Sequence, residues 1–477
     1  MDRRVKTWVL LTLLTLGMAT CARLAKDGLI VGPSAAGLGR EGRWFTYHGR
    51  PIYLIGYDAQ ELAANPAIDY ATALDLFARY RLNKVRLWSY SYWSPDGFWH
   101  PWPYTNGKFN LDAWNEAYWQ RLRAVVAAAK RRGIMVEYSI FAPNHVADQE
   151  RWSSPTSRPA WNKAFNLNGV FSSNSEGSFT PQFFDLTHGE TSTSGRTLKD
   201  YQQALLDKAV AELGGFDNVY FEVCNEFPLR AGNTDQLYPW QHFWARRLRA
   251  TTKHLVSVHA HQYVGDQTTG IQYFWDEPSI DALTFHFSTS DPEGISQLLH
   301  RAQMHQKILQ SNEGGDPSTA LSAATRSAWG FVTAGGHYAF YEDDNRRIGS
   351  PAWVEGARRL KVVHDVVGRL RFWDMSPVDA MGHEYDQLIT AGPAGANRQV
   401  IAEPGSQYLA YFWGSQSDTP VAIQLGSGRY CYQWYDPRDG RQLLTGTVTG
   451  GGMTIIPVPS ALDWSADDGL ALVIRAL

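Results

Sequence analysis

Two glutamates follow apolar runs that are typical of buried strands. Glu226 ends the run that begins at Val219, and Glu313 ends the run that begins at Lys307. In an eight-stranded parallel βα barrel, the active site is built from the C-terminal ends of the strands. Two carboxyl groups about 5 Å apart can serve as nucleophile and proton donor in retaining glycoside hydrolysis. The pair therefore predicts chemistry on a carbohydrate, provided that a barrel brings the two strand ends together.

Three further polar residues fall at predicted strand ends. Arg86, on the second strand, could hold the nucleophile ionised. Asn225, beside Glu226, could bond the 2-hydroxyl of the reacting sugar, and His286, on the sixth strand, could bond either carboxylate or the substrate. Each residue alone also has a structural interpretation, such as a salt bridge for Arg86 or a core position for His286.

The aromatic content points to sugar stacking. The chain has 19 Trp, 23 Tyr and 21 Phe, and C–H faces of pyranose rings pack on aromatic faces. Trp88 and Trp93 lie at the start of a Trp- and Pro-rich loop after the second strand, which is predicted to line the sugar cleft. Tyr57 and Asp58 after the first strand and Tyr341 in the eighth are further candidates for substrate contact. For any single tryptophan, packing in the core is the alternative.

The elements that must position these residues alternate along the chain. Strand-like apolar runs alternate with amphipathic helical stretches, the pattern of a parallel βα fold. Predicted helices include residues 114–132 and 200–213, and a polar excursion over residues 144–197 is predicted to cover the active face. Eight strands are predicted at residues 52–56, 84–88, 134–141, 219–226, 262–266, 282–287, 307–313 and 339–342.

The pattern changes after residue 374. Helical periodicity stops, and short alternating runs separated by turn residues follow, which predicts a β-sandwich of about 100 residues. The expected fold is therefore α/β: a (β/α)8 TIM barrel with a C-terminal β-sandwich domain. The expected boundaries are a signal peptide at 1–25, the barrel at 26–375 and the β-sandwich module at 376–477, with direct packing between the two folded parts.

The N-terminal segment has the pattern of a secretory signal. Arg3, Arg4 and Lys6 precede an apolar stretch at residues 8–16, and small residues follow it. A secreted or periplasmic protein is expected, and Cys21 permits a bacterial lipid anchor as an alternative. No other stretch of about 18 apolar residues exists, so no membrane-spanning segment is predicted.

Composition narrows the possible partners. The chain has 477 residues, an apolar fraction of 44% and a formal net charge of −3. Because this charge is not basic, no nucleic-acid partner is expected. Cys224 and Cys431 are expected to be buried free thiols. No zinc-ligand spacing is present, and His259 and His261 are predicted to lie before the fifth strand, so neither a metal nor a cofactor is expected.

These residues resemble a known group of enzymes. Asn225-Glu226 on strand four, Glu313 on strand seven, Arg86 on strand two and His286 on strand six resemble clan A of the glycoside hydrolases, over about residues 40–345. The resemblance implies that Glu226 is the acid/base and Glu313 the nucleophile.

Two shorter segments narrow the resemblance. The segment from Gly42 to Glu61 is similar to bacterial cellulase-like and apiosidase-like barrels, and 435–440 is similar to a hairpin of their C-terminal β-module. His337-Tyr338 is a departure, because many members of the clan offer a Trp to the reacting sugar near strand eight.

The expected function is that of a secreted retaining glycoside hydrolase. Its partner would be a carbohydrate substrate, a plant or microbial polysaccharide or oligosaccharide whose O-glycosidic bonds are cleaved by a two-carboxylate double displacement. A non-catalytic carbohydrate-binding barrel is the alternative, disfavoured because both carboxylates are intact. A metal-dependent hydrolase is disfavoured because no H-E-x-x-H motif is present. The sequence leaves open the sugar, the linkage, endo or exo action and the oligomeric state.

Overall fold

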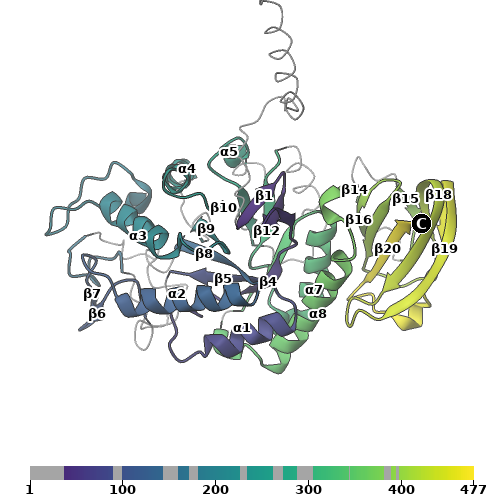
Figure 1. The fold of residues 1–477 in the computed structure, drawn as a ribbon, viewed down its shortest axis with the longest axis horizontal. Helices are drawn as coiled ribbons and strands as arrows, with labels where there is room; N and C mark the ends of the chain where they lie inside the picture. Colours follow the sequence, from purple (N-terminus) through teal and green to yellow (C-terminus); the bar gives the residue numbers. More distant parts are fainter. Residues whose placement is uncertain are drawn as a thin grey trace, which may run out of the picture. The chain divides into compact units, whose positions relative to one another are not determined.

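The computed structural model describes residues 37–89, 99–142, 160–170, 181–225, 234–261, 272–286, 305–342, 344–380, 388–393 and 397–477 (Figure 1). The predicted signal peptide with Cys21, the loop residue Trp93 and the predicted acid Glu226 lie outside these ranges.

Eight parallel strands close into a barrel, which confirms the predicted TIM-barrel fold. The strands follow one another around the barrel in chain order, and the last, β13, pairs with the first, β4. They are β4 (Ile55–Asp58), β5 (Lys84–Trp88), β8 (Met135–Phe141), β9 (Val219–Cys224), β10 (Val256–His261), β11 (Ala282–Phe285), β12 (Ile308–Ser311) and β13 (His337–Phe340).

Helices follow the strands, and several begin at residues that stop a strand and cap a helix. Asp69 caps α1, Thr197 and Asp200 form a capping box on α3, and Asp316 and Ser350 each precede a proline at the start of α7 and α8. The α-helices are α1 (Tyr70–Arg79), α2 (Glu116–Arg131), α3 (Leu198–Leu213), α4 (Thr234–Thr251), α5 (Gln272–Trp275), α7 (Pro317–Thr333) and α8 (Pro351–Val367). Short 3-10 helices are η2 (Pro181–Phe184), η5 (Asn345–Arg347), η6 (Phe372–Asp374) and η7 (Ala461–Asp463).

The prediction of strand five was wrong. The structure places it at β10, Val256–His261, where it pairs with β9 and β11, whereas the predicted residues 262–266 lie outside the described ranges. The cause is the composition of this strand, because three of its six residues are Ser257, His259 and His261, which are more typical of a loop. His259 is therefore on strand five and not before it, and its ring lies 4.3 Å from the ring of His286.

The N-terminal end of the barrel is closed by a small sheet. Strands β1 (Leu38–Glu41), β2 (Trp44–Tyr47) and β3 (Arg50–Pro51) form an antiparallel sheet. Its Leu38 and Phe45 form an apolar cluster with residues at or just before the starts of barrel strands, including Leu54, Met135 and Ile308. This packing fixes which end of the barrel is open to a ligand. A second small sheet joins β6 (Tyr104–Thr105) and β7 (Lys108–Phe109).

The C-terminal part is antiparallel β-structure, as predicted. Its strands pair in the order β14-β16-β17-β20-β18-β15, with β19 on β18. They are β14 (Ser376–Ala380), β15 (Ile389–Ala391), β16 (Arg398–Glu403), β17 (Gln407–Phe412), β18 (Val421–Tyr435), β19 (Gln442–Ile456) and β20 (Leu470–Ala476).

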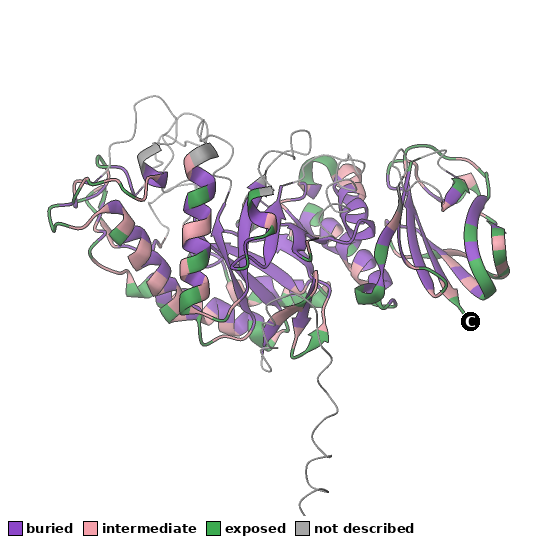
Figure 2. Ribbon diagram, turned by 90° about the horizontal axis from the view of Figure 1, so that it is seen from above, coloured by how far each residue is buried: buried purple, intermediate pink, exposed green. Residues whose placement is uncertain are grey.

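The long strand β18 changes partner along its length. Its first half pairs with β15 and its second half with β20, and its register against β19 shifts between Leu425 and Gly428. Strands that bend at such irregularities allow a sheet to fold over its own core. Side chains from both halves of β18, such as Ile423 and Trp434, share one apolar cluster. β19 alternates between exposed and less exposed residues, unlike the buried barrel strands (Figure 2).

Direct contacts join the C-terminal sheet to the helices α7 and α8 and the segment after α8. Trp329 stacks on Tyr411 with ring centroids 5.7 Å apart, and Thr333 Oγ1 lies 3.0 Å from Gln399 Oε1. Residues 34–477 form one compact unit. Within the described ranges, Cys224 and Cys431 form no disulfide, and no helix has the length and apolarity needed to span a membrane.

Candidate active site

The interior of the barrel is polar. TIM barrels are ordinarily filled by branched apolar side chains. Here six strands, two of them together with the residue that directly follows, place buried polar residues at two positions spaced by two, the spacing that puts both side chains on one face of a strand. These pairs are Lys84 and Arg86, Glu137 and Ser139, Tyr220 and Glu222, Ser257 and His259, Thr284 and His286, and Gln310 and Asn312.

The lower layer is a closed hydrogen-bond network. Lys84 Nζ lies 3.0 Å from Glu137 Oε2 and donates to Gln310 Oε1 at 2.8 Å, and Gln310 Nε2 donates to Glu137 Oε1 at 2.6 Å. Tyr220, from β9, also donates to Gln310 Oε1, at 2.8 Å. Burial opposes the charge on Glu137, but Lys84 and then Arg86 outweigh it and hold the pKa of that carboxyl below its usual value. The layer forms a rigid floor beneath the strand ends.

The upper layer is organised around Arg86, which is fully buried. Its Nε and Nη2 donate to Glu222 Oε2 at 3.0 and 2.6 Å, and its Nη2 also donates to Asn225 Oδ1 at 2.6 Å. Its Nη1 donates to Glu313 Oε1 at 2.6 Å and lies 3.7 Å from Asp58 Oδ2. One guanidinium therefore joins strands β4, β5, β9 and the end of β12, and it fixes the direction of the Glu313 carboxylate.

Three carboxyl groups compete for this one cation. Burial raises the pKa of Asp58 well above its usual value, further than Arg86 can lower it, and burial also raises the pKa of Glu222 to about 7. Burial works against the charge of Arg86, but Glu222, Asp58 and Glu313 outweigh it and raise the pKa of the guanidinium. Burial therefore disfavours the charged forms of Asp58 and Glu222, whereas Glu313, the third partner of Arg86, is the one of the three that is partly exposed.

Glu313 is the carboxylate of the cluster that reaches the surface, with 10% of its side chain exposed. It follows β12 by two residues and precedes Gly314, where a Cβ atom would come within 2.2 Å of the ring of Tyr338. His286 Nδ1 lies 3.4 Å from Glu313 Oε2. Burial lowers the pKa of His286 to about 4, so the ring is neutral at neutral pH and can donate one hydrogen bond without neutralising the carboxylate.

Asn225 directly follows β9, and its backbone nitrogen donates to Phe141 O at 2.9 Å. Its side-chain oxygen accepts from Arg86, whereas its side-chain nitrogen has no hydrogen-bond partner within the described ranges. That buried nitrogen is a hydrogen-bond donor available to a ligand at this end of the barrel. Glu226, the next residue, lies outside the described ranges, so its distance from Glu313 is not defined.

The predicted aromatic and first-strand contacts divide into two groups. Trp88 is buried at the end of β5 with the Arg86 guanidinium 5.3 Å from its ring, and Tyr341 is half-buried with its backbone nitrogen 3.0 Å from Gly315 O. Both lie beside the cluster. Tyr57 does not, because its hydroxyl donates to Trp353 O at 3.2 Å and its ring stacks on that tryptophan of α8. The expectation of a substrate contact for Tyr57 is corrected accordingly. Asp58, the next residue, points inward to Arg86.

The His337-Tyr338 departure is also explained. His337 lies at the start of β13, where its Nδ1 accepts from the backbone nitrogen of Leu54 and its ring packs 4.8 Å from that of Phe45. It belongs to the closed end of the barrel and cannot replace a tryptophan at a reacting sugar.

Sequence reasoning missed Glu222, Lys84, Glu137 and Gln310. The signal that could have found them is the repeat of polar residues at every second position of otherwise apolar strands. Within the described ranges, no group of three or more His, Cys, Asp or Glu residues is arranged to hold a metal ion, although His259-Ala260-His261 has an H-x-H spacing.

The parallel eight-stranded barrel with its C-terminal antiparallel sheet is a fold shared with solved structures of glycoside hydrolases, including one of family 5. A glycoside hydrolase of family 5 from Bacteroides vulgatus is similar with a TM-score of 0.63 at 14% identity, over 95% of this chain and 96% of that one. Another structure described as a glycoside hydrolase gives a TM-score of 0.63 at 13% identity, over 93% and 97% of the two chains.

The endo-1,4-beta-mannanase of Rhizomucor miehei gives a TM-score of 0.50 at 14% identity, over 70% of this chain and 100% of that one. At these identities the likeness is one of fold. No protein-family model and no curated protein matches the sequence.

Proposed function

We propose that the protein is a secreted retaining glycoside hydrolase that cleaves O-glycosidic bonds in a polysaccharide or oligosaccharide. The observation that supports this most is the carboxylate of Glu313, which Arg86 holds at 2.6 Å and which lies 3.4 Å from neutral His286, after the C-terminal end of a barrel strand. A carboxylate held ionised and partly exposed in this position has the properties of a nucleophile.

In the proposed reaction, a Glu313 oxygen attacks the anomeric carbon while Glu226 donates its proton to the departing glycosidic oxygen. The C–O bond to the leaving group breaks as the glycosyl–Glu313 ester forms. Glu226, now ionised, removes a proton from water, which attacks the same carbon and releases Glu313. Asn225 Nδ2 donates to the 2-hydroxyl of the reacting sugar, and Arg86 stabilises the carboxylate as it leaves.

The substrate that we propose to test first is a β-1,4-linked mannan or glucomannan. The support is the fold shared with an endo-1,4-beta-mannanase, together with a strand-end cluster that offers hydrogen-bond donors and acceptors to a neutral sugar. We also propose that residues 1–25 direct export, with a lipid anchor on Cys21 as the alternative to free secretion. The mass of the mature N-terminus distinguishes the two.

Replacement of each glutamate in the presence of azide tests the mechanism. Glu313→Gly should lose at least about 10³-fold in kcat. Azide, which fits the space that the glutamate leaves, should restore turnover of an activated β-aryl glycoside and give an α-glycosyl azide, the configuration opposite to the donor's. Glu226→Ala should lose much more activity on substrates with poor leaving groups than on activated aryl glycosides. Azide should give that variant a product of retained configuration.

Two results would contradict the proposal. Near-normal turnover by Glu313→Gly on a natural substrate would exclude the nucleophile. Binding of saccharides by the wild type without hydrolysis of any glycoside would favour a non-catalytic carbohydrate-binding barrel instead.

A further inference from the structure

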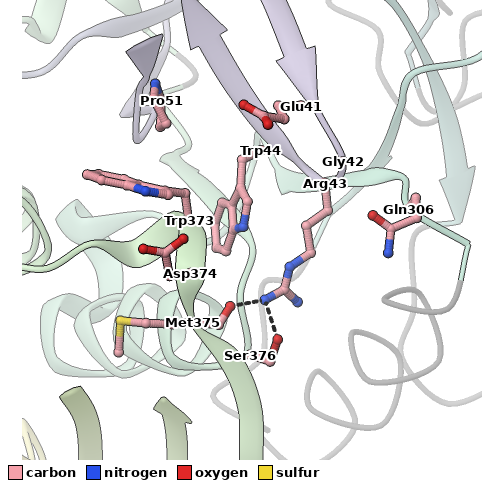
Figure 3. A pocket seen from close by; sticks show the side chains of 10 residues that line it. All are labelled: Glu41, Gly42, Arg43, Trp44, Pro51, Gln306, Trp373, Asp374, Met375 and Ser376. Carbon is pink, nitrogen blue, oxygen red and sulfur yellow. Dashed lines mark hydrogen bonds between the residues drawn. The ribbon is translucent and has the colours of Figure 1, made fainter. Parts of the chain in front are cut away.

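A pocket of about 470 Å³ lies outside the candidate active site (Figure 3). Three segments far apart in sequence line it: the β1–β3 region, the residue Gln306 before β12, and the residues after α8 that lead into β14. Its lining residues are Glu41, Gly42, Arg43, Trp44, Pro51, Gln306, Trp373, Asp374, Met375 and Ser376. The volume is in the range of pockets that hold small molecules.

Two arginines hold the walls of this pocket in place. Arg40 Nη1 donates to the backbone oxygens of Gly42 and Gln306 at 2.9 and 3.0 Å, and Arg40 Nε donates to Asp281 at 2.9 Å. Arg43 donates to Met375 O and, at 3.4 Å, to Ser376 Oγ, as Figure 3 shows. The β1–β3 sheet is thereby tied both to the barrel and to the segment that enters the C-terminal sheet.

The pocket is at the opposite end of the barrel from Glu313. Pro51 and Gln306 precede β4 and β12, whereas Glu313 follows β12. Parallel strands carry their N-terminal ends on one side and their C-terminal ends on the other. A ligand in the pocket would therefore contact none of the residues of the proposed reaction.

The lining favours a neutral polyhydroxylated ligand. Trp373 is 40% exposed, which is unusual for a tryptophan, and the carboxylates of Glu41 and Asp374 line the same pocket (Figure 3). An aromatic face beside carboxylate and amide acceptors can stack on a sugar ring and accept from its hydroxyls.

Other ligand classes fit this lining less well. Glu41 repels an anion, and Asp374 is paired with Arg371 at 3.0 Å. The guanidinium of Arg43, which also lines the pocket, is already bonded to backbone and lies 4.7 Å from the ring of Trp44. No group of three metal-binding side chains is found within the described ranges.

We propose that this pocket is a second saccharide-binding site, which binds a neutral β-1,4-linked hexose chain at the closed end of the barrel. Its polymeric ligand rests on the proposed function. One polymer chain held there raises the effective concentration of glycosidic bonds near the open end of the same or a neighbouring molecule. The site supplies binding and no catalysis.

The test measures binding separately from cleavage. In a Glu313→Gln background, which spares the polymer, mannohexaose is titrated calorimetrically and retardation is measured in native gels that contain glucomannan. Trp373→Ala should raise the dissociation constant for glucomannan, measured from gel retardation, by roughly ten-fold. In the calorimetric titration, this variant should lose one of the two sets of binding sites for mannohexaose. Trp373→Phe, which keeps an aromatic face, and Glu41→Gln should have smaller effects. Ile455→Ala, at an exposed apolar residue of β19, is the matched control and should have none.

Parallel assays in the active protein distinguish the two proposals. Trp373→Ala should raise the half-saturating concentration of glucomannan and leave kcat/KM on an aryl glycoside unchanged. If the protein hydrolyses glucomannan but Trp373→Ala, Trp373→Phe and Glu41→Gln all bind the saccharides as the parent protein does, the second site is wrong and the proposed enzyme stands. Trp373-dependent binding without hydrolysis of any glycoside would support the site and overturn the enzyme. No binding of either saccharide by the Glu313→Gln protein would overturn the site.

Discussion

The barrel and the C-terminal sheet both enclose a fully buried interior, but they fill it with different chemistry. The inner cluster of the C-terminal sheet is apolar, with residues such as Val400, Phe412 and Trp434. The barrel interior instead contains Lys84 and Arg86 with the carboxyl groups of Glu137, Glu222 and Asp58, all at 0% exposure. Both interiors hold a β-sheet together, so sheet stability does not require the charges.

The difference indicates where function has shaped the molecule. A buried ion pair is often no more stabilising than well-packed apolar residues of similar volume, because desolvation of the charges offsets their attraction. Burial of more carboxyl groups than cations, as around Arg86, also raises the pKa of Asp58 and Glu222 and so disfavours their charged forms. We infer that the barrel retains this arrangement because it holds Glu313 in a defined position and charge state.

The largest test of this contrast is removal of the central cation. Arg86→Met should destabilise the protein by about 3–5 kcal/mol, because it leaves buried carboxyl groups without their partner. It should also lower kcat by about 10²-fold or more, because Glu313 loses the bond that orients it and keeps it ionised. Chemical denaturation and steady-state kinetics measure the two effects.

Arg86→Lys is the matched control for that variant. It keeps a positive charge but loses the forked geometry that joins Glu222, Asn225 and Glu313. Intermediate losses in both stability and kcat are expected. If Arg86→Met kept kcat within a few-fold of the wild type, the cluster would be structural and the contrast with the C-terminal sheet would lose its functional meaning.

A cavity in the apolar interior should give the opposite profile. Trp434 is fully buried, donates from Nε1 to Pro457 O at 2.8 Å and packs 5.7 Å from Phe412. Trp434→Ala should cost about 3–5 kcal/mol of stability. Its kcat on an aryl glycoside, at a temperature where it remains folded, should equal that of the wild type. A loss of kcat in the folded variant would show that the C-terminal sheet takes part in catalysis.

The fold was predictable from sequence to the extent that apolar periodicity marks each element. β5 was predicted to the residue, because Lys84–Trp88 is short, apolar at alternate positions and flanked by a helix. β10 was missed, because Ser257, His259 and His261 gave a buried strand the composition of a loop. A polar barrel interior therefore weakens the signal that identifies its strands.

The site was predictable only to the level of strand ends. Tyr57 and Asp58 were both proposed as substrate contacts, but adjacent residues of a strand face opposite sides, so only one could point inward. Arg86, His286 and Glu313 were identified individually, whereas the sharing of Arg86 with Glu222 depends on contacts across the barrel that no local pattern encodes. The pocket around Trp373 depends likewise on three distant segments.

The smallest expected effect, and the sharpest in its pH dependence, comes from Glu222→Gln. Burial raises the native pKa of Glu222 to about 7, whereas an unfolded glutamate titrates at 4.5. Between these values the unfolded chain releases a proton that the native state retains, so raising the pH lowers the free energy of unfolding of the wild type. Glutamine has no proton to lose, so Glu222→Gln should gain stability relative to the wild type from about pH 4.5 to 7, by at most about 3 kcal/mol.

The comparison isolates this one group. His286, whose burial lowers its pKa to about 4, makes both proteins lose stability as the pH falls below about 6.5, and this contribution cancels in the difference. In Glu222→Gln, the side-chain oxygen can still accept from Arg86, but the side-chain NH2 then faces Asn312 Nδ2. Two donors meet there, because Asn312 Nδ2 donates to Glu222 in the wild type. That conflict adds a pH-independent cost of about 1 kcal/mol.

Denaturation of both proteins between pH 4 and 8 measures the difference, with Glu116→Gln, at an exposed glutamate of α2, as the control. A difference that is flat across this range would show that the native and unfolded states have the same pKa for Glu222, and the raised pKa of this carboxyl would be contradicted.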